Sequence, residues 1–489
     1  MLKKNLKLIQ PVKQVKENKM YLIKKSFNLL ALASILSFSL VTSPYAKEQP
    51  PVGSKPSNFQ VPKTSTMQLD NGLKVTFIPY GTTPKATIRL ITNTGNIDDG
   101  NQPWLADLSY EMLRQGTKTQ SAKEIAENVA SMGGQINSSV AMDSSWLGLD
   151  VLSEFSEDAI DVLADMILNP ALAKSDLSRI KTDRTRQLTV QLSQPGNIAS
   201  QAFYKAIYAN HLYGELYPSE ESLSSISGDN ISQYLTKNIV AGRSHLYISG
   251  VFEQSSLLEK ISKAFSTWPQ GEAKKSMSVI SQTGPKVIML ERENSPQSTI
   301  RLGLAAIAPD HQDTMAMNMM NTLLGGAFSS RITSNIREDK GYTYSPYSTI
   351  VNRINSGVWF QAADITLEYT GAALTEIFNE INLLAKTPPS TEELDGIKNY
   401  MAGIFVLRNS SRAAVINQLS FIELHQLSDN YLKDYVANVY NVTPERISEM
   451  ASKYLRPEKM TLVVVGDKAQ LTPQLKALEA LKGFGNIGE

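Results

Sequence analysis

The sequence contains no cysteine among its 489 residues. Disulfides, thiolate metal sites, cysteine nucleophiles and a lipoprotein anchor through an N-terminal cysteine are therefore excluded. Histidine is scarce as well, and no two histidines lie four residues apart. The histidines are His211, His245, His311 and His425. Because a helix presents two imidazoles to one zinc ion at that spacing, no paired-histidine zinc motif is present.

An excess of charge of either sign is also lacking. The chain has 48 lysines and arginines against 47 aspartates and glutamates, which gives a formal net charge of +1. Without a global electrostatic field, we expect no nucleic-acid partner. Hydrophobic residues make up 42% of the chain and charged residues 19%, a composition typical of globular proteins. The length exceeds what one core supports and indicates two to four domains.

An apolar run over residues 27–41 stands near the N-terminus. Lys24 and Lys25 precede it, and Ala46 marks a small-residue exit. This pattern predicts a secretory signal over 1–46, with Met20 as the alternative start of translation. The run is short for a membrane span, which needs about 20 residues. We therefore expect a periplasmic protein; the alternative is an uncleaved segment that anchors it in the inner membrane, facing the periplasm.

Two short sequences occur twice at nearly the same offset. Residues 84–90 (PKATIRL) return 212 residues later at 296–302 (PQSTIRL). Residues 245–250 (HLYISG) return 216 residues later at 461–466 (TLVVVG). The matched offsets predict a duplicated domain of about 200 residues rather than an array of short repeats. Each copy has strand patterns followed by helical ones, which indicates an α+β fold of two homologous halves, each a mixed sheet covered by helices.

Composition sets the predicted domain boundaries. A Pro/Ser/Lys-rich stretch over 47–64 is expected to be a linker, followed by an N-terminal domain over 65–267. A second polar linker over 268–284 leads to a C-terminal domain over 285–489.

Local patterns predict the individual elements. Asn71-Gly72 between alternating apolar residues predicts a hairpin over 66–79, and alternation predicts one strand over 140–152. Two helical stretches are expected between 170 and 245. Other predicted helices cover 104–113, 123–132, 156–168, 313–324, 329–338, 369–384 and 391–408, and further strands cover 342–351 and 357–365. The glycine pairs at 133–134 and 325–326 are expected to end helices.

Several motifs of the first half resemble one enzyme family. They are Asn93–Asp99, Gly116–Thr119, Ala130–Gly134 and Asn169-Pro170. Together they are similar to the N-terminal half of the pitrilysin/insulinase-type zinc peptidases, family M16, and the resemblance extends over roughly residues 60–485. It implies two homologous halves that form half of a clamshell. In active members a His-x-x-Glu-His helix binds zinc and its glutamate activates water, while a glutamate about 75 residues further on is the third ligand.

The sequence departs from the family at each of these positions. The motif window, counted back from Gly116, holds Asp107 and Glu111 in place of the histidines and Tyr110 in place of the general base. The distal ligand position falls near Gln187. Two carboxylates without imidazole bind zinc poorly. We therefore expect no cofactor in this chain and no catalytic residue of its own.

The second half matches the family where the first half departs from it. Residues 324–331 (LGGAFSSR) and 336–345 (IREDKGYTYS) resemble its C-terminal half, in which an arginine and a tyrosine contact the substrate backbone and the tetrahedral intermediate. Arg337 and Tyr344 have the matching spacing. A guanidinium offers planar donors to a peptide carbonyl, and a phenol can stabilise an oxyanion. The alternative is structural: Arg337 caps a helix and Tyr344 packs in a strand.

The resemblance implies a division of labour between two chains. It predicts the non-zinc, substrate-binding subunit of a heteromeric periplasmic zinc endopeptidase, inactive alone, with Arg337 and Tyr344 as its substrate-binding residues. A partner M16 chain with His-x-x-Glu-His would hold the zinc, in a heterodimer or higher assembly acting on peptides. One alternative is an inactive scaffold or peptide-binding protein with the M16 fold. The last is a stand-alone hydrolase that uses Asp107, Tyr110 and Glu111.

The apolar run generates a prediction about maturation. We expect the exported protein to begin near Lys47, because the run is too short to span a bilayer comfortably and its exit is small and polar. N-terminal sequencing of protein from the envelope fraction measures this. A chain with its full N-terminus in the cytosol would contradict it.

Overall fold

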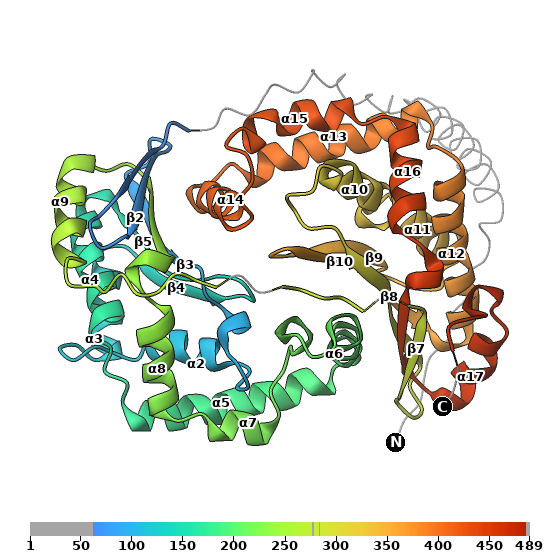
Figure 1. The fold of residues 1–489 in the computed structure, drawn as a ribbon, viewed down its shortest axis with the longest axis horizontal. Coiled ribbons are helices and arrows are strands. Elements are labelled where there is room, and N and C mark those ends of the chain that lie inside the picture. Colours follow the sequence, from blue (N-terminus) through green and yellow to red (C-terminus); the bar gives the residue numbers. More distant parts are fainter. Residues whose placement is uncertain (1–61, 276–277, 283, 486–489) are drawn as a thin grey trace, which may run out of the picture. The chain divides into compact units, whose positions relative to one another are not determined.

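The computed structural model describes residues 62–275, 278–282 and 284–485. The predicted signal segment and nearly all of the linker over 47–64 lie outside the described residues. Within them, no helix has the length and apolar character needed to cross a membrane. Two β-sheets, each covered by helices, make up the fold (Figure 1). The α+β class with a mixed sheet in each half is thus confirmed.

The two sheets have the same topology apart from one extra strand. The first has the order β1-β2-β6-β3-β5-β4 and the second β7-β11-β8-β10-β9. The strands are β1 Ser65–Gln68, β2 Lys74–Pro79, β3 Lys85–Thr92, β4 Gln135–Val140, β5 Ser145–Leu152, β6 Ser244–Gly250, β7 Lys286–Glu291, β8 Gln297–Ala306, β9 Tyr347–Arg353, β10 Ser356–Thr366 and β11 Thr461–Gly466. Among the strands of the described residues, only the pairs β2–β6 and β7–β11 are parallel. Strands β2, β6, β3, β5 and β4 therefore correspond to β7, β11, β8, β10 and β9.

Strand register preserves the sequence repeats. Ile88 of β3 lies opposite Ile248 of β6, and Ile300 of β8 lies opposite Val464 of β11. These pairs are related by the offsets of 212 and 216 residues that the two repeats show. The duplication predicted from the repeats is confirmed.

A cross-strand hydrogen bond is duplicated with the strands. Thr87 Oγ1 donates to Asp150 Oδ1 at 2.5 Å, and Thr299 Oγ1 donates to Asp364 Oδ1 at the same distance. Cross-strand side-chain pairs of this kind fix register. The threonine of each repeated heptapeptide thus has the same structural role in both halves.

Helices follow the strands in the same order in both halves. The first half has α2 Leu105–Met112, α3 Ala122–Ser131, α4 Ser156–Leu168, α5 Lys174–Ser193, α6 Pro195–Tyr208, α7 Glu220–Ser225, α8 Gly228–Asn238 and α9 Gln254–Ala264. The second has α10 Thr314–Asn321, α11 Arg331–Thr333, α12 Thr370–Lys386, α13 Thr391–Arg408, α14 Arg412–Leu424, α15 Tyr431–Asn441, α16 Pro444–Tyr454 and α17 Lys468–Lys476. The helices predicted over 156–168 and 391–408 have the predicted bounds. Described residues between α9 and β7 form neither helix nor strand, and the domain boundaries remain predictions.

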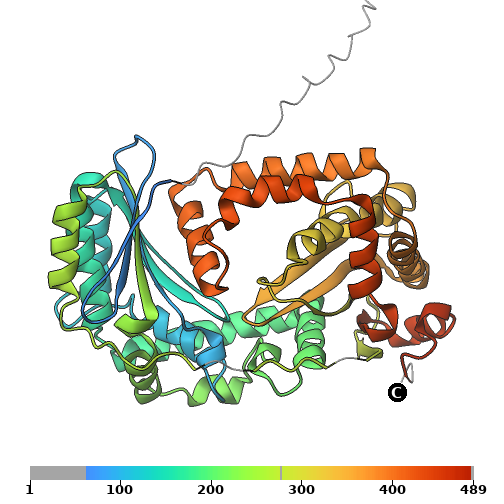
Figure 2. The same cartoon turned by 45° about the horizontal axis from the view of Figure 1, so that its top comes forward.

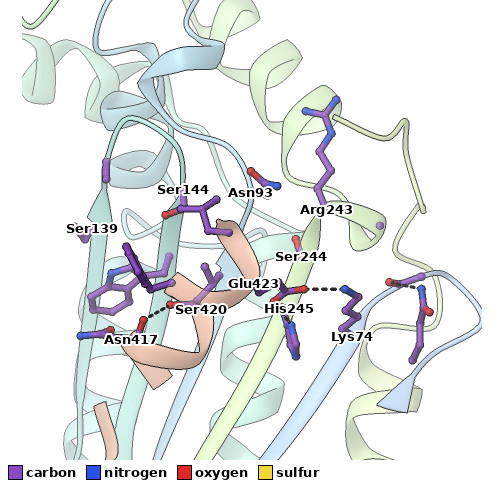
Figure 3. Close-up of a pocket in the computed structure, with 18 residues that line it drawn as sticks. Lys74, Asn93, Ser139, Ser144, Arg243, Ser244, His245, Asn417, Ser420 and Glu423 are labelled. Carbon is purple, nitrogen blue, oxygen red and sulfur yellow. Dashed lines mark hydrogen bonds and ion pairs between the residues drawn. The ribbon is translucent and has the colours of Figure 1, made fainter. Parts of the chain in front are cut away.

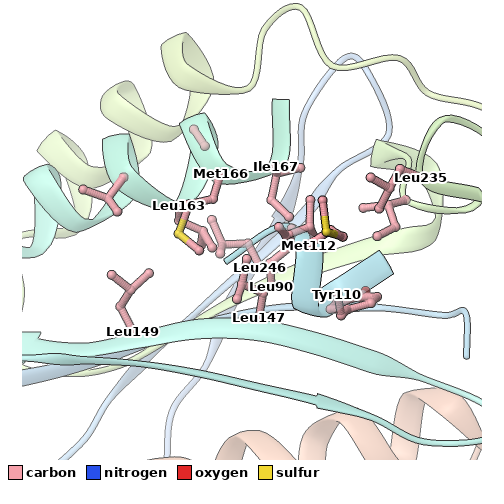
Figure 4. Packing of buried hydrophobic residues seen from close by; sticks show 14 of the residues in the cluster. Leu90, Tyr110, Met112, Leu147, Leu149, Leu163, Met166, Ile167, Leu235 and Leu246 are labelled. Carbon is pink, nitrogen blue, oxygen red and sulfur yellow. The ribbon is translucent and has the colours of Figure 1, made fainter. Parts of the chain in front are cut away.

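Amphipathic helices build the core of the first half. Leu163, Met166 and Ile167 of α4 point toward the sheet, where they meet Leu90 and Leu246 (Figure 4). All five side chains are buried. Replacing one such leucine with alanine typically costs about 2–5 kcal/mol. The opposite face of this sheet is left for other elements to cover.

The single strand predicted over 140–152 is wrong. The segment belongs to a hairpin of β4 and β5, closed by a hydrogen bond from the Ala141 N–H to the Ser144 carbonyl at 3.0 Å. Neither glycine nor proline lies at the turn, whose central residues are Met142 and Asp143. The strongest turn signals are therefore missing, and only Asp143 and the serines after it mark the turn.

Between this hairpin and β6 the chain has more helices than predicted. Four helices beyond α4 (α5 to α8) occupy a region for which two were expected. Pro195 begins α6 directly after α5, a position where its missing N–H costs nothing. Ser219 and Ser227 cap α7 and α8 by accepting hydrogen bonds from backbone amides.

Two other boundaries differ from the prediction. The strand expected over 342–351 begins only at Tyr347, because Pro346 has no N–H to donate to the ladder. The hairpin over 66–79 is confirmed as the β1–β2 pair, but only Gly72 has left-handed backbone, with φ of +88°. The helices predicted over 313–324 and 329–338 end in π-helical turns, Thr322–Gly326 and Ser334–Asp339.

Each half covers the open face of the other half's sheet with one helix. Helix α6 packs on β8 and β11, and α14 packs on β3 and β6 (Figures 1 and 2). The α6 contact is apolar, with Phe203 and Ile207 in one cluster with Phe360 and Val463. The two helices occupy corresponding places, since α6 follows α5 and α14 follows α13.

The α14 contact is partly ionic. Glu423 Oε1 accepts a hydrogen bond from Lys74 Nζ at 2.8 Å (Figure 3). Its Oε2 accepts one from the Tyr247 hydroxyl at 2.7 Å and lies 2.6 Å from His245 Nδ1. Despite the opposing effect of burial, bonds from His245, Lys74 and Tyr247 lower the pKa of Glu423 to about 2. Glu423 therefore ties α14 to the first sheet as a carboxylate.

This tie predicts a pH-dependent contribution to stability. A carboxylate with a depressed pKa stabilises the fold above its ordinary pKa of 4.5, and the contribution is lost as pH falls toward 2. We expect Glu423→Gln to cost about 1–2 kcal/mol at pH 7, a value reduced for partial exposure. The difference from wild type should shrink at low pH, measured by denaturant unfolding across pH.

Glu127→Gln is a suitable control, because Glu127 is exposed and pairs only loosely with Lys123 at 3.6 Å. It should leave stability nearly unchanged. Identical unfolding curves for wild type and Glu423→Gln at pH 7 would refute the ionic tie.

Candidate functional site

The degenerate zinc motif lies on α2. Hydrogen bonds from polar side chains fix the position of the N-terminal end of this helix. Asp99 accepts hydrogen bonds from the amides of Trp104 and Ala106 at 2.9 and 2.8 Å, and burial raises the pKa of Asp99 to about 8. Asn96 Nδ2 donates to Asp99 at 3.0 Å and to Asp107 at 2.7 Å. Burial also raises the pKa of Asp107. Asp107 thus accepts a hydrogen bond from an amide within the protein.

Tyr110, at the position of the family's general base, belongs to the core. Its side chain is 2% exposed and lies in the cluster with Leu90, Leu147 and Met112 (Figure 4). Burial raises the pKa of the Tyr110 hydroxyl, so the phenol stays neutral. It is not placed to act as a base toward a substrate.

Glu111 and Gln187 are joined by a residue that the sequence did not indicate. Arg184 of α5 donates from Nε to Glu111 Oε2 at 2.8 Å, and its Nη2 lies 2.8 Å from the same oxygen. Its Nη1 donates to Gln187 Oε1 at 3.1 Å. The ring of Trp104 lies 6.0 Å from the guanidinium carbon. The predicted degenerate positions therefore do come together, around a guanidinium.

The zinc ion that the family implies does not fit these residues. A zinc site needs lone pairs from about three protein ligands. Here Glu111 and the Gln187 oxygen accept from Arg184, and Asp107 accepts from Asn96. Within the part of the chain that the structure describes, no three histidine, cysteine, aspartate or glutamate side chains are grouped to hold a metal.

The structure brings Arg337 and Tyr344 together. Arg337 lies in the π-helical turn Ser334–Asp339, and Tyr344 lies in the loop before β9. The guanidinium carbon is 5.4 Å from the centroid of the Tyr344 ring, and Tyr344 is 80% exposed. Tyr344 therefore does not pack in a strand, which was the structural alternative.

Phe328 completes this group and was missed in the sequence. Its ring centroid lies 4.2 Å from the guanidinium carbon of Arg337, and its side chain is 71% exposed. Arg337 thus contacts two exposed aromatic rings. We call Phe328, Arg337 and Tyr344 the aromatic–arginine group. The available signal was a single large apolar residue among the small ones of Gly325–Ser330.

Gly325 positions the loop that carries Phe328. A Cβ on Gly325 would lie 2.6 Å from Ser348 Oγ and 2.7 Å from Gln361 Oε1, closer than any side chain tolerates. Only glycine lets the end of the π-helical turn pack this tightly on β9 and β10. The pair Gly325-Gly326 ends a helix, as predicted.

A polar pocket of about 420 Å³ lies beneath α14. Its lining includes Ser139 and Ser144 from the β4–β5 hairpin and Asn417 and Ser420 from α14 (Figure 3). Arg89 Nη1 donates to Asn417 Oδ1 at 2.7 Å. The two halves therefore build this pocket jointly.

Comparison with known proteins identifies the family. Residues 75–217 match the model of the insulinase family, peptidase family M16, and residues 225–401 match that of the peptidase M16 inactive domain. The chain belongs to peptidase family M16. The family resemblance seen in the sequence is thereby confirmed.

Relatives of this M16 chain carry differing names. It is 26% identical to "Uncharacterized zinc protease YmxG" of Bacillus subtilis, over 82% of this chain and 98% of the relative. It is 23% identical to "Non-peptidase homolog YmxG" of Helicobacter pylori, over 76% and 87% of the two chains.

Solved structures share the fold. A peptidase M16 inactive domain from Pseudomonas fluorescens superposes with a TM-score of 0.77 at 25% identity, covering 83% of this chain and 98% of that one. A protease from Helicobacter pylori gives 0.76 at 17% identity, covering 83% and 100%. The second likeness bears on the fold alone.

The contacts of Asp107, Glu111 and Gln187 predict that the isolated M16 chain binds no stoichiometric zinc. The candidate ligands already accept hydrogen bonds, and carboxylates without imidazole are poor zinc ligands. Elemental analysis of protein purified without chelators measures the content. About one zinc per chain, lost on Glu111→Ala, would contradict the expectation.

Proposed function

We propose that this chain is the non-zinc, substrate-binding subunit of a heteromeric periplasmic M16 endopeptidase. In this proposal the aromatic–arginine group contacts a peptide held at a partner's zinc. The observation that carries the proposal is the placement of Arg337, in the π-helical turn, beside the exposed ring of Tyr344 in the following loop. The isolated chain is expected to be inactive.

The chemistry of the group suits a peptide in a transition state. Phe328 and Tyr344 contact the guanidinium through their rings, which limits its motion while donors at its edge remain oriented. A planar guanidinium donates two parallel hydrogen bonds to carbonyl or carboxylate oxygens. The Tyr344 hydroxyl can donate to an oxyanion that develops on a neighbouring carbonyl.

The partner in this proposal is an M16 chain with a complete His-x-x-Glu-His helix. It would hold zinc and activate water, since α2 of this chain does neither. The printed names of two similar proteins, a "non-peptidase homolog" and a "peptidase M16 inactive domain", support a chain without its own zinc chemistry. The apolar run over 27–41 supports the periplasm as the compartment.

Replacing the two residues should slow turnover without loss of assembly. Removing one oriented oxyanion donor typically costs about 10²–10³ in kcat, so we expect Tyr344→Phe to lose that much. Arg337→Lys keeps the charge but not the planar fork and should be similarly impaired. Peptide cleavage by the reconstituted pair measures the rate, and size-exclusion chromatography measures assembly.

Tyr369→Phe and Arg456→Lys are matched controls, since both side chains are partly exposed outside the loop. They should leave the rate unchanged. Wild-type rates for both Tyr344→Phe and Arg337→Lys would favour the alternative of an inactive scaffold or peptide-binding protein. Cleavage by the chain alone would contradict both proposals.

A further inference from the structure

A cation of the protein itself stands where the family implies a metal. We propose that Arg184 takes over the structural role of the missing zinc, joining α2 to α5 and closing the site to metal ions. This inference concerns the N-terminal half and does not depend on the function proposed for Arg337 and Tyr344.

The geometry assigns Arg184 to the former ligand positions. Three of its nitrogens contact Glu111 on α2 and Gln187 on its own helix, at 2.8 to 3.1 Å. Both partners are positions at which the family places zinc ligands. Burial raises the pKa of Asp107, and the positive charge of Arg184 acts on this carboxyl in the opposite direction. One guanidinium therefore interacts with all three.

Partial burial increases the contribution of the Arg184–Glu111 ion pair to stability. The side chains of Arg184 and Glu111 are 23% and 28% exposed, so each has lost much of its hydration. Removing one partner of such a pair leaves the other charge uncompensated. A zinc ion at Glu111 would have to displace the guanidinium or lie against its positive charge, which Coulomb repulsion opposes.

This arrangement predicts that restoring ligands alone does not restore a metal site. The first variant carries Asp107→His, Glu111→His and Gln187→Glu, keeps Tyr110 in the core and retains Arg184. The second adds Arg184→Ala. We expect the second to bind roughly one zinc per chain and the first to bind at least 10-fold more weakly, measured by titration with zinc.

Equal affinities in the two variants would overturn the exclusion of metal by Arg184, whether both bind zinc tightly or neither does. Circular dichroism establishes that each variant is folded. A second experiment uses the native sequence, where no ligand is introduced.

In that experiment Arg184→Met should lower Tm by roughly 4–8 °C, because Glu111 loses its counter-charge. Adding Glu111→Gln should recover part of the loss. Arg186→Met is the matched control: Arg186 is 73% exposed on the same helix and should change Tm little. Zinc or chelator should leave the wild-type Tm unchanged. An unchanged Tm for Arg184→Met, or a wild-type Tm that depends on zinc, would overturn the inference that Arg184 takes over the structural role of zinc.

Discussion

The structure depends on the need of each sheet to bury two faces. Alternating residues of β8 to β11 point to opposite sides, so helices of the same half cover only one side. Helix α6 covers the remaining face of the second sheet and α14 that of the first. The first of these contacts is apolar, whereas the second includes the ionic tie at Glu423. The two copies of the duplicated domain are therefore held together by reciprocal helices, and the polar pocket beneath α14 results from that exchange.

The two halves carry different polar groups outside their core clusters. In the first half, Glu111 and Gln187 contact Arg184 between α2 and α5, outside the core cluster that holds α2 on the sheet. In the second half, the three side chains of the aromatic–arginine group lie outside the core cluster. Side chains outside the cores can change chemistry at little cost in stability.

The sequence predicted what depends on local pattern and missed what depends on distant contacts. The heptapeptide repeat predicted equivalent strands because strand faces require the same alternation, and the Thr87 and Thr299 hydrogen bonds follow from that register. The resemblance of the motifs around Arg337 and Tyr344 to the family likewise predicted a pair. Arg184 was missed because its partner Glu111 lies 73 positions away, and no periodicity marks a contact between separate helices. The turn between β4 and β5 was missed because it contains neither glycine nor proline.

The two sites bear differently on function. In the α2 site, Asp107, Glu111 and Gln187 already accept hydrogen bonds from Asn96 or Arg184, so these ligand positions have partners within the protein. The aromatic–arginine group is the opposite case, because it holds Phe328 and Tyr344 largely in solvent, where their apolar surface gains nothing from burial. The exposed rings are therefore the part of the second half on which the proposed contact with a peptide depends.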